Sequence, residues 1–317
     1  MTNQERASVI VREVGPRDGL KMLKQVIPTE AKLRWIGAML EAGMSHMEVG
    51  SFVPVSLLPQ LADSAHVLRT VQQSHPQLTA TVLAPNLRGI KDAVAAGARS
   101  IIIPVSASEA HSRSNVRRSR EEQVVEFGRA ADWIRTPGTS APRLEAALAT
   151  AFGCSLQGNV PEDDVVRMSG RLVLAGADVV TLADTLGYAT PSQVRRLIRA
   201  VRKEIGAEKL GALHLHDTLG AALANVYAAL EEGVRAFDGA LGGLGGCPYA
   251  PGSAGNVATE DLVYLLESEG YDTGIDLHRL LEARRMLRQT VPDEPLYGRI
   301  AAAGVPPTYR HVTRQLV

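Results

Sequence analysis

The sequence has few cysteines and few aromatic residues. Among 317 residues there are two cysteines, Cys154 and Cys247, which lie far apart and form no disulfide framework of the kind that small secreted domains need. We therefore expect a reducing compartment, the cytoplasm. Aromatic residues make up 4% of the chain. The core must then consist mainly of Ala, Val, Leu and Ile, which suits buried parallel strands and amphipathic helices.

Net charge and long apolar runs are also absent. Lys plus Arg number 34, as do Asp plus Glu. A neutral chain has no general attraction for nucleic acid or for an anionic membrane. No run approaches the roughly 18 apolar residues of a membrane span, and residues 1–8 contain no apolar segment typical of a secretory signal. We expect neither nucleic acid nor membrane as a partner.

One local basic cluster stands out against this neutral background. Its members are Arg113, Arg117, Arg118 and Arg120. We interpret it as the solvated entry to a helix, because charge runs are usually surface faces. A site for a phosphorylated ligand is the alternative.

Apolar, strand-like runs alternate with helical patterns along the whole chain. The predicted strands are residues 9–14, 47–49, 79–83, 101–105, 144–151, 179–182, 210–215 and 237–241. Predicted helices follow them at 29–41, 57–73, 90–96, 121–134, 161–175, 190–201, 221–231 and 259–269, with one more at 277–288. Strands separated by helices indicate a parallel sheet.

Eight such units predict an α/β fold, a closed (β/α)8 TIM barrel. An open, doubly wound sheet is the alternative, but no G-x-G-x-x-G motif follows the first strand. We expect one barrel domain over residues 1–317, with residues 271–317 as a short helical C-terminal extension.

Catalytic groups of a barrel lie at the carboxyl ends of its strands. The polar residues found at these positions are Arg17, Asp18, Glu48, Ser51, Asp184, His214, His216 and, after a glycine-rich loop, Cys247 and Asn256.

His214 and His216 are two residues apart on a predicted strand, so both imidazoles project from the same face. The structural alternative is that both are core histidines whose hydrogen bonds are satisfied within the protein. Asp18, at the matching end of the first strand, favours a divalent-metal site, and an amide oxygen from Asn256 can complete the protein ligands. Because no thiolate is among these candidates, we predict Mg²⁺ or Mn²⁺.

Arg17 and Cys247 each allow two interpretations. Arg17 can stabilise a developing enolate oxygen, or it can form a structural ion pair with Glu48 or Asp184. Cys247 lies in the glycine-rich loop over residues 242–250, which can move as a lid or hold an anion. Its thiol can protonate a carbanion, or it can be a small buried hydrophobe. For Cys154 we favour simple packing.

Taken together, these motifs resemble the 3-hydroxy-3-methylglutaryl-CoA lyase family of metal-dependent barrel enzymes. The resemblance extends from Val11 to about Leu281. It is strongest at residues 13–20, 214–218, 242–250 and 255–263.

The resemblance implies a role for each matching residue. Asp18, His214, His216 and Asn256 resemble the metal ligands, Arg17 the group that stabilises the thioester enolate, Glu48 and Asp184 site carboxylates, and Cys247 the catalytic cysteine. We count His214 among the catalytic residues too, and predict substrate contacts from Arg17, Lys21, Ser51 and Thr181.

The reaction implied is cleavage of the C2–C3 bond of the acyl-CoA substrate, giving acetyl-CoA and acetoacetate. The general base is His214 or Asp18. The resemblance further implies leucine degradation and ketone-body formation, and a homodimer or larger homo-oligomer.

This chain departs from the family at several flanking positions. Lys21-Met22-Leu23 replaces the usual Gln-Asn-Glu, and Thr181 and Ala183 replace Ser and Gly. We therefore hypothesise that the reaction is kept while the acyl group differs. The alternatives are a condensing synthase or a 2-oxo-acid aldolase of the same superfamily, a zinc hydrolase, and a binding protein without turnover.

Overall fold

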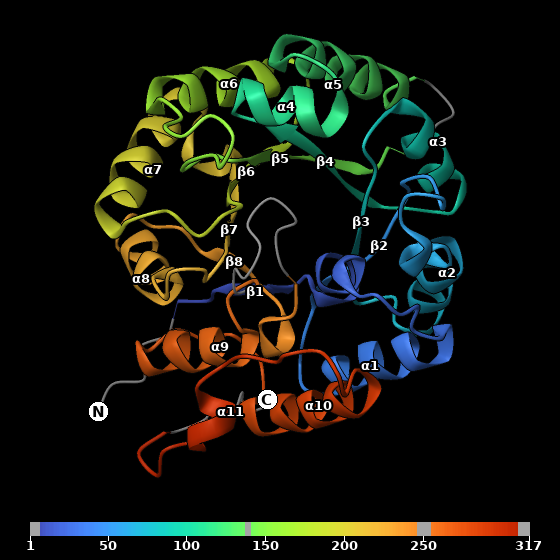
Figure 1. Cartoon of the computed structure of the whole chain (residues 1–317), viewed down its shortest axis with the longest axis vertical. Helices are drawn as coiled ribbons and strands as arrows, with labels where there is room; N and C mark the ends of the chain where they lie inside the picture. Colours follow the sequence, from blue (N-terminus) through green and yellow to red (C-terminus); the bar gives the residue numbers. More distant parts are fainter. Residues whose placement is uncertain (1–6, 137–140, 246–254, 310–317) are drawn as a thin grey trace.

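The computed structural model describes residues 7–136, 141–245 and 255–309. Eight parallel strands close into a barrel in the order β1 to β8, with β1 paired to β8. The strands are β1 Ile10–Glu13, β2 His46–Ser51, β3 Thr79–Leu83, β4 Ser100–Ser106, β5 Arg143–Ala149, β6 Val179–Asp184, β7 Leu210–Leu215 and β8 Ala236–Gly239. The predicted TIM barrel is thus confirmed, and the open doubly wound sheet is excluded (Figure 1).

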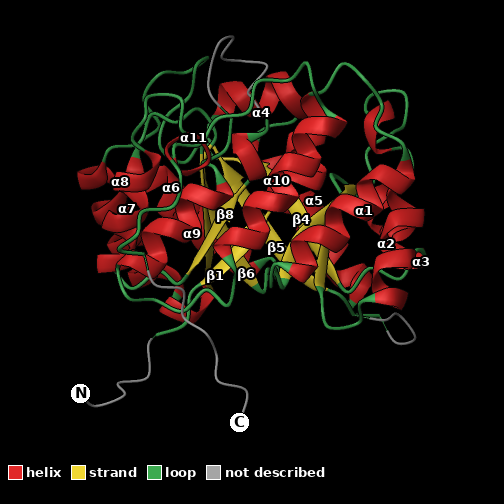
Figure 2. Ribbon diagram, turned by 90° about the horizontal axis from the view of Figure 1, so that it is seen from below, coloured by secondary structure: helices red, strands yellow, loops and turns green. Residues whose placement is uncertain are grey.

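Most of the helices surround the barrel as an outer ring, whereas the short helix Glu109–Val116 lies nearer the barrel axis (Figures 1 and 2). The helices are α1 Thr29–Glu41, α2 Ser64–Ser74, α3 Leu87–Ala95, α4 Glu109–Val116, α5 Arg120–Ile134, α6 Glu162–Leu174, α7 Pro191–Ile205, α8 Ala222–Glu231, α9 Thr259–Ser268, α10 Leu277–Thr290 and α11 Ile300–Ala303. None of the helices in the described part of the chain is long and apolar enough to cross a membrane.

Two helical segments differ from the prediction. The helix expected to start at residue 57 begins at Ser64, because a 3-10 turn over Pro59–Leu61 comes first. A separate helix, α4, occupies part of the basic cluster. It ends at Arg117, whose φ of 56° is left-handed, and a capping box at Ser119 then starts α5.

Three of the four arginines of the basic cluster pair with acidic side chains on the surface. Arg113 contacts Glu109, Arg118 contacts Glu126, and Arg120 contacts Asp164. These ion pairs support the solvated-face interpretation.

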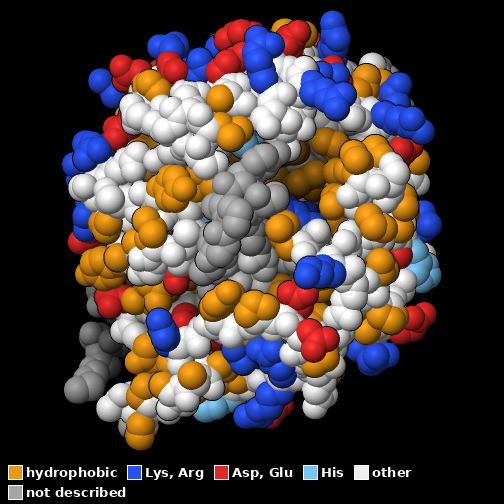
Figure 3. All heavy atoms as spheres, in the orientation of Figure 1, with side chains coloured by type: hydrophobic (Ala, Val, Ile, Leu, Met, Phe, Trp, Pro, Cys, Tyr) orange, Lys and Arg blue, Asp and Glu red, His pale blue; other side chains and the backbone are white. Residues whose placement is uncertain are grey.

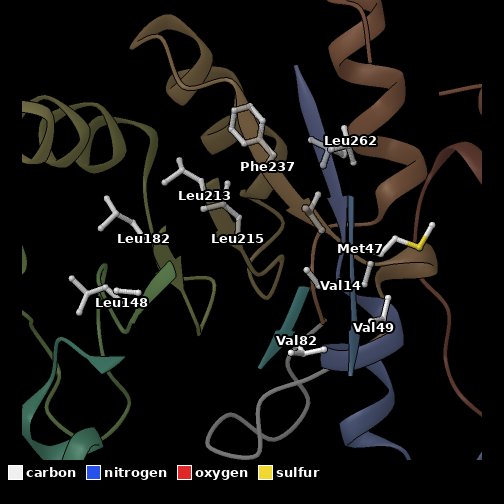
Figure 4. Close-up of a cluster of buried hydrophobic side chains, with 14 of the residues drawn as sticks. Val14, Met47, Val49, Val82, Leu148, Leu182, Leu213, Leu215, Phe237 and Leu262 are labelled. Atoms are coloured by element: carbon white, nitrogen blue, oxygen red, sulfur yellow. The ribbon is translucent and has the colours of Figure 1, made fainter. Parts of the chain in front are cut away.

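The hydrophobic core lies between the strands and the helices. Side chains of a strand alternate between its two faces. The outward-facing set, including Val82, Leu148, Leu182, Leu213 and Phe237, is almost fully buried against the helices (Figure 4). The opposite residues of the same strands face the barrel interior, where several are charged.

After the last barrel helix the chain continues through α10, which packs against α1 and α9 (Figure 1). Arg284 of α10 donates to Glu260 of α9, and Asp261 accepts from the amides of Arg299 and Ile300. The division into one domain with an extension from residue 271 stays a prediction.

Candidate active site at the carboxyl ends of the strands

A tight turn after β1 brings Arg17 and Asp18 into the barrel mouth. Residues Gly15–Gly19 form a single π-helical turn in which the carbonyl of Val14 accepts from the amide of Asp18 at 2.6 Å. A Cβ on Gly15 would lie 2.4 Å from Glu13 Oε1 and 2.9 Å from the Trp35 ring, so only glycine fits there. Both site residues are buried.

Arg17 bridges two carboxylates. Its Nε donates to Glu48 Oε2 at 2.5 Å, and its Nη1 donates to Asp18 Oδ1 at 2.5 Å. The ion pair predicted between Arg17 and Glu48 is therefore present. Burial raises the pKa of Glu48 although the Arg17 charge opposes this shift, and Glu48 Oε1 has no hydrogen-bond partner among the described residues.

Asp18, His214 and His216 form one cluster. Their nearest ligand atoms lie within 4.8 Å of one another, and the two imidazole centroids are 5.1 Å apart. The histidines share a face of the barrel wall, as their spacing predicts. Asn256 joins the cluster through an antiparallel bridge to His216 and a 3.0 Å hydrogen bond from its Nδ2 to Asp18 Oδ2.

The protonation states of Asp18 and His216 suit a cation. Burial opposes ionisation of Asp18, but Lys21 and Arg17 hold the pKa of its carboxyl well below the usual range. Burial lowers the pKa of His216 to about 3, so its imidazole is neutral. A carboxylate and a neutral imidazole are the forms that bind metals.

Two buried atoms of the cluster lack a partner. Asn256 Oδ1 and His216 Nδ1 form no hydrogen bond within the described parts of the chain. A buried polar atom left unpaired costs about 1–3 kcal/mol, and a divalent cation would use oxygen and imidazole nitrogen as ligands. The residues present therefore fit a divalent metal ion.

His214 is held by a neighbour that the sequence reasoning missed. Its Nδ1 lies 3.1 Å from Oδ2 of Asp238, a buried residue of β8 that faces the barrel interior. Burial lowers the pKa of His214, but the hydrogen bond and charge of Asp238 outweigh this effect and raise it. A charged residue inside the apolar run Ala236–Gly239 was the available signal.

The predicted substrate-binding residue Ser51 reaches the interior because of an irregularity in β2. Glu48 pairs with Thr81 and Ser51 pairs with Leu83, with a register shift between Glu48 and Gly50. Since Thr81 and Leu83 are two residues apart on β3, Glu48 and Ser51 lie on one face. The Ser51 hydroxyl is buried without a described partner.

The other predicted residues have contacts of several kinds. Lys21 Nζ lies 2.6 Å from Asp18 Oδ1, within the cluster. Asp184 accepts from the amides of Tyr188 and Ala189, so it orders the loop after β6, and burial raises its pKa to about 6. Thr181 Oγ1 donates to Glu145 Oε1 at 2.5 Å. The roles assigned to Lys21, Asp184 and Thr181 stay predictions.

Cys247 lies outside the described residues. The glycines that flank this stretch are close together. A Cβ on Gly255 would come within 1.9 Å of the carbonyl oxygen of Gly245. Viewed down the barrel, this face is hollowed near its centre, with charged side chains of both signs around the periphery (Figure 3).

Comparison with known proteins assigns this chain to a family. The model of the family described as HMGL-like matches residues 8–287. The chain belongs to the HMGL-like family. It is 42% identical over 275 residues to the cytoplasmic 3-hydroxy-3-methylglutaryl-CoA lyase of Rattus norvegicus, covering 87% of this chain and 79% of that protein. It is 38% identical to the hydroxymethylglutaryl-CoA lyase of Bacillus subtilis, covering 92% and 95%.

Solved structures agree with the sequence relatives. The hydroxymethylglutaryl-CoA lyase of Pseudomonas aeruginosa superimposes with a TM-score of 0.88 at 39% identity, covering 94% of this chain and 97% of that chain. The carboxyl transferase domain of Rhizobium etli pyruvate carboxylase, at 20% identity and a TM-score of 0.70, shows a similar fold.

Proposed function

We propose that this protein is a divalent-metal-dependent carbon–carbon lyase that cleaves 3-hydroxy-3-methylglutaryl-CoA to acetyl-CoA and acetoacetate. The observation that carries the proposal is the buried cluster of Asp18, His214 and His216, beside which Asn256 Oδ1 has no hydrogen-bond partner among the described residues. The relatives at about 40% identity are curated as lyases acting on this substrate. They favour a lyase over a condensing synthase.

The thioester carrier has separate support. A relative from Acinetobacter baumannii, 36% identical with a TM-score of 0.89, is described in complex with coenzyme A and 3-methylmalate. We infer that this chain, too, binds an acyl-CoA at the barrel mouth.

Asp18, His214, His216 and Asn256 would hold Mg²⁺ or Mn²⁺. When bound, such an ion supplies Lewis acidity that lowers the pKa of a coordinated hydroxyl group. The donors are carboxylate, amide oxygen and imidazole, without thiolate, and this set suits the harder ions.

The protein's own residues then perform the cleavage. His214 or Asp18 accepts the proton of the 3-hydroxyl group, the C3–O bond becomes a carbonyl, and the C2–C3 electron pair moves to C2 as an acetyl-thioester enolate. Arg17, fixed by Glu48, donates to the enolate oxygen. The Cys247 thiol delivers a proton to C2 and completes acetyl-CoA.

The first test is turnover by metal-stripped protein. We expect acetyl-CoA release from 3-hydroxy-3-methylglutaryl-CoA only after Mg²⁺ or Mn²⁺ is added. Cys247→Ala should lower the rate by roughly 10²–10⁴-fold while metal binding persists. Cys154→Ala is the matched control, since that thiol packs in the core. Rapid release without metal, or full activity of Cys247→Ala, would contradict the proposal.

The acyl group remains part of the proposal. Lys21 places a cation beside Asp18 where the family usually has an uncharged side chain, and this departure motivates one alternative, a larger 3-substituent on the same kind of thioester. Comparing rates on the methylglutaryl thioester with those on longer 3-substituted homologues tests this alternative. A clear preference for the methyl compound would reject it.

Location, pathway and assembly are also proposals. We propose a cytoplasmic homodimer or larger homo-oligomer that acts in leucine degradation and ketone-body formation. Three curated relatives are named cytoplasmic, whereas others are named mitochondrial. Cell fractionation tests the location, light scattering of the purified protein tests the assembly, and loss of growth on leucine after deletion of the gene tests the pathway.

A further inference from the structure

A chain of polar contacts crosses the barrel interior beside the cluster of Asp18, His214 and His216. Arg12 of β1 donates through Nε to Asp238 Oδ1 at 2.6 Å, and through Nη1 to both oxygens of Glu145 at 2.9 and 2.7 Å. Thr181 Oγ1 donates to Glu145 at 2.5 Å. Asp238 Oδ2 in turn meets His214 Nδ1.

The contact between Arg12 and Glu145 spans the barrel. Glu145 belongs to β5, which is four strands away from β1 in either direction around the ring (Figure 1). Both side chains are largely buried, with 14% and 4% of their surface exposed. The contact joins opposite walls instead of two neighbouring strands.

The Arg12 guanidinium divides its hydrogen bonds between two carboxylates. Its Nη1 donates to Glu145 and its Nε donates to Asp238 Oδ1, while Nη2 has no hydrogen-bond partner among the described residues. In these contacts Arg12 engages one oxygen of Asp238, and the other oxygen lies 3.1 Å from His214 Nδ1.

That acceptor determines which nitrogen of His214 carries the hydrogen. An ionised carboxylate can only accept, so Nδ1 must be the donor. In the neutral imidazole the lone pair then lies on Nε2, which is left to bind a metal ion. Metal-binding histidines commonly depend on such a partner for their tautomer and ring orientation.

We propose that Arg12 and Glu145 are positioning residues, which hold the Asp238 carboxylate so that it fixes His214 in its metal-binding tautomer. This inference rests on the metal site of the proposed function. It assigns a role to two charged residues that the cleavage chemistry does not use.

The test measures Mn²⁺ affinity by electron paramagnetic resonance, without substrate, on folded protein. We expect Glu145→Gln, Arg12→Met and Asp238→Asn each to weaken Mn²⁺ binding by roughly tenfold or more. The double variant Arg12→Met/Glu145→Leu should be no weaker than the poorer single variant, because both residues act through Asp238. Non-additivity is the signature of residues in one network.

Lys32→Met is the matched control. Lys32 is a buried cation that pairs with Asp63 outside the barrel interior. Its loss should lower thermal stability without changing the Mn²⁺ affinity of the folded protein. If a single variant does not fold, the double variant, which leaves neither Arg12 nor Glu145 charged, carries the test.

Two results would overturn the inference. One is wild-type affinity in Glu145→Gln and Arg12→Met while Asp238→Asn binds weakly, since Asp238 would then act alone. The other is absence of Mn²⁺ binding in the wild type, which also removes the proposed metal site. Wild-type protein that binds Mn²⁺ but releases no acetyl-CoA would instead reject the proposed reaction and leave this inference standing.

Discussion

Asp18 is the residue on which the contacts of the site converge. One carboxylate oxygen accepts from both Arg17 and Lys21, and the other accepts from Asn256. Arg17 is held by its hydrogen bond to Glu48, whereas the Lys21 side chain is 30% exposed and can turn away from Asp18 into solvent. A metal ion at Asp18 must therefore compete with the Lys21 ammonium group.

We predict that Lys21→Gln binds Mn²⁺ more tightly, by about threefold to tenfold after allowance for solvent screening. If Lys21 also contacts the substrate, the same variant should show a higher KM. Mn²⁺ titration and steady-state kinetics measure the two effects separately. Lys24→Gln, an exposed neighbour, is the control and should change neither. Equal Mn²⁺ affinity in Lys21→Gln and wild type would show that Lys21 does not compete.

At the scale of elements, the segments that contain Gly243, Gly245 and Gly255 lie so close together that their backbones touch and leave no space for a side chain on Gly255. Gly255 approaches the backbone so closely that a Cβ would lie 1.9 Å from the carbonyl oxygen of Gly245 and 2.3 Å from that of Gly243. Asn256 follows directly and contacts Asp18. Any shift of this strand-like bridge moves a predicted ligand.

Gly255→Ala is accordingly expected to destabilise the fold by roughly 1–3 kcal/mol and to lower acetyl-CoA release at least tenfold. Thermal unfolding and the release assay are the measurements. Gly37→Ala in α1, where no described atom beyond the neighbouring backbone of the helix lies within 4 Å of the added Cβ, should be neutral or up to about 1 kcal/mol more stable. Normal activity in Gly255→Ala would mean that the backbone relaxes without moving Asn256.

At the scale of the whole molecule, buried carboxylates join the first and last parts of the barrel. Glu13 of β1 faces outward and accepts from the amide of Leu241 at 3.0 Å and from the Thr259 hydroxyl at 2.6 Å. Burial raises the pKa of Glu13, and likewise that of Glu260, to about 7. Glu13 thereby ties β1 to the chain beyond β8, whereas Glu260 accepts from the amide of Gly242 and from Arg284.

The raised pKa of Glu13 predicts a pH dependence of stability. Because the folded pKa of about 7 lies above the unfolded value, the protonated group stabilises the fold at low pH, and this contribution is lost as the pH rises through 7. Glu13→Gln removes the titrating group and keeps an oxygen acceptor. The variant should therefore gain stability relative to wild type between pH 5.5 and pH 8.5, by roughly 1–3 kcal/mol.

Urea unfolding at both pH values checks this prediction. Glu30→Gln, on the exposed face of α1, serves as the control and should follow the wild type. Parallel curves for Glu13→Gln and wild type would show that the hydrogen bonds to Glu13 offset its burial.

Much of the fold and part of the site could be predicted from local pattern. Alternating runs located all eight strands, and the two-residue spacing of His214 and His216 fixed their common face. Arg12, Glu145 and Asp238 were not found, although each interrupts an apolar strand run. A single charged residue in such a run does not reveal which distant strand supplies its partner.

The sequence by itself determined the order of strands and helices, the side chains that we predict to bind a metal ion and the strand ends that carry them, because periodicity and residue chemistry are local properties. Only the tertiary structure decided what meets across the barrel. Closure of β1 onto β8 sets Arg12 beside Asp238, and the opposite wall supplies Glu145. A register shift in β2 turns Ser51 inward. Such contacts depend on closure and register, which no local pattern specifies.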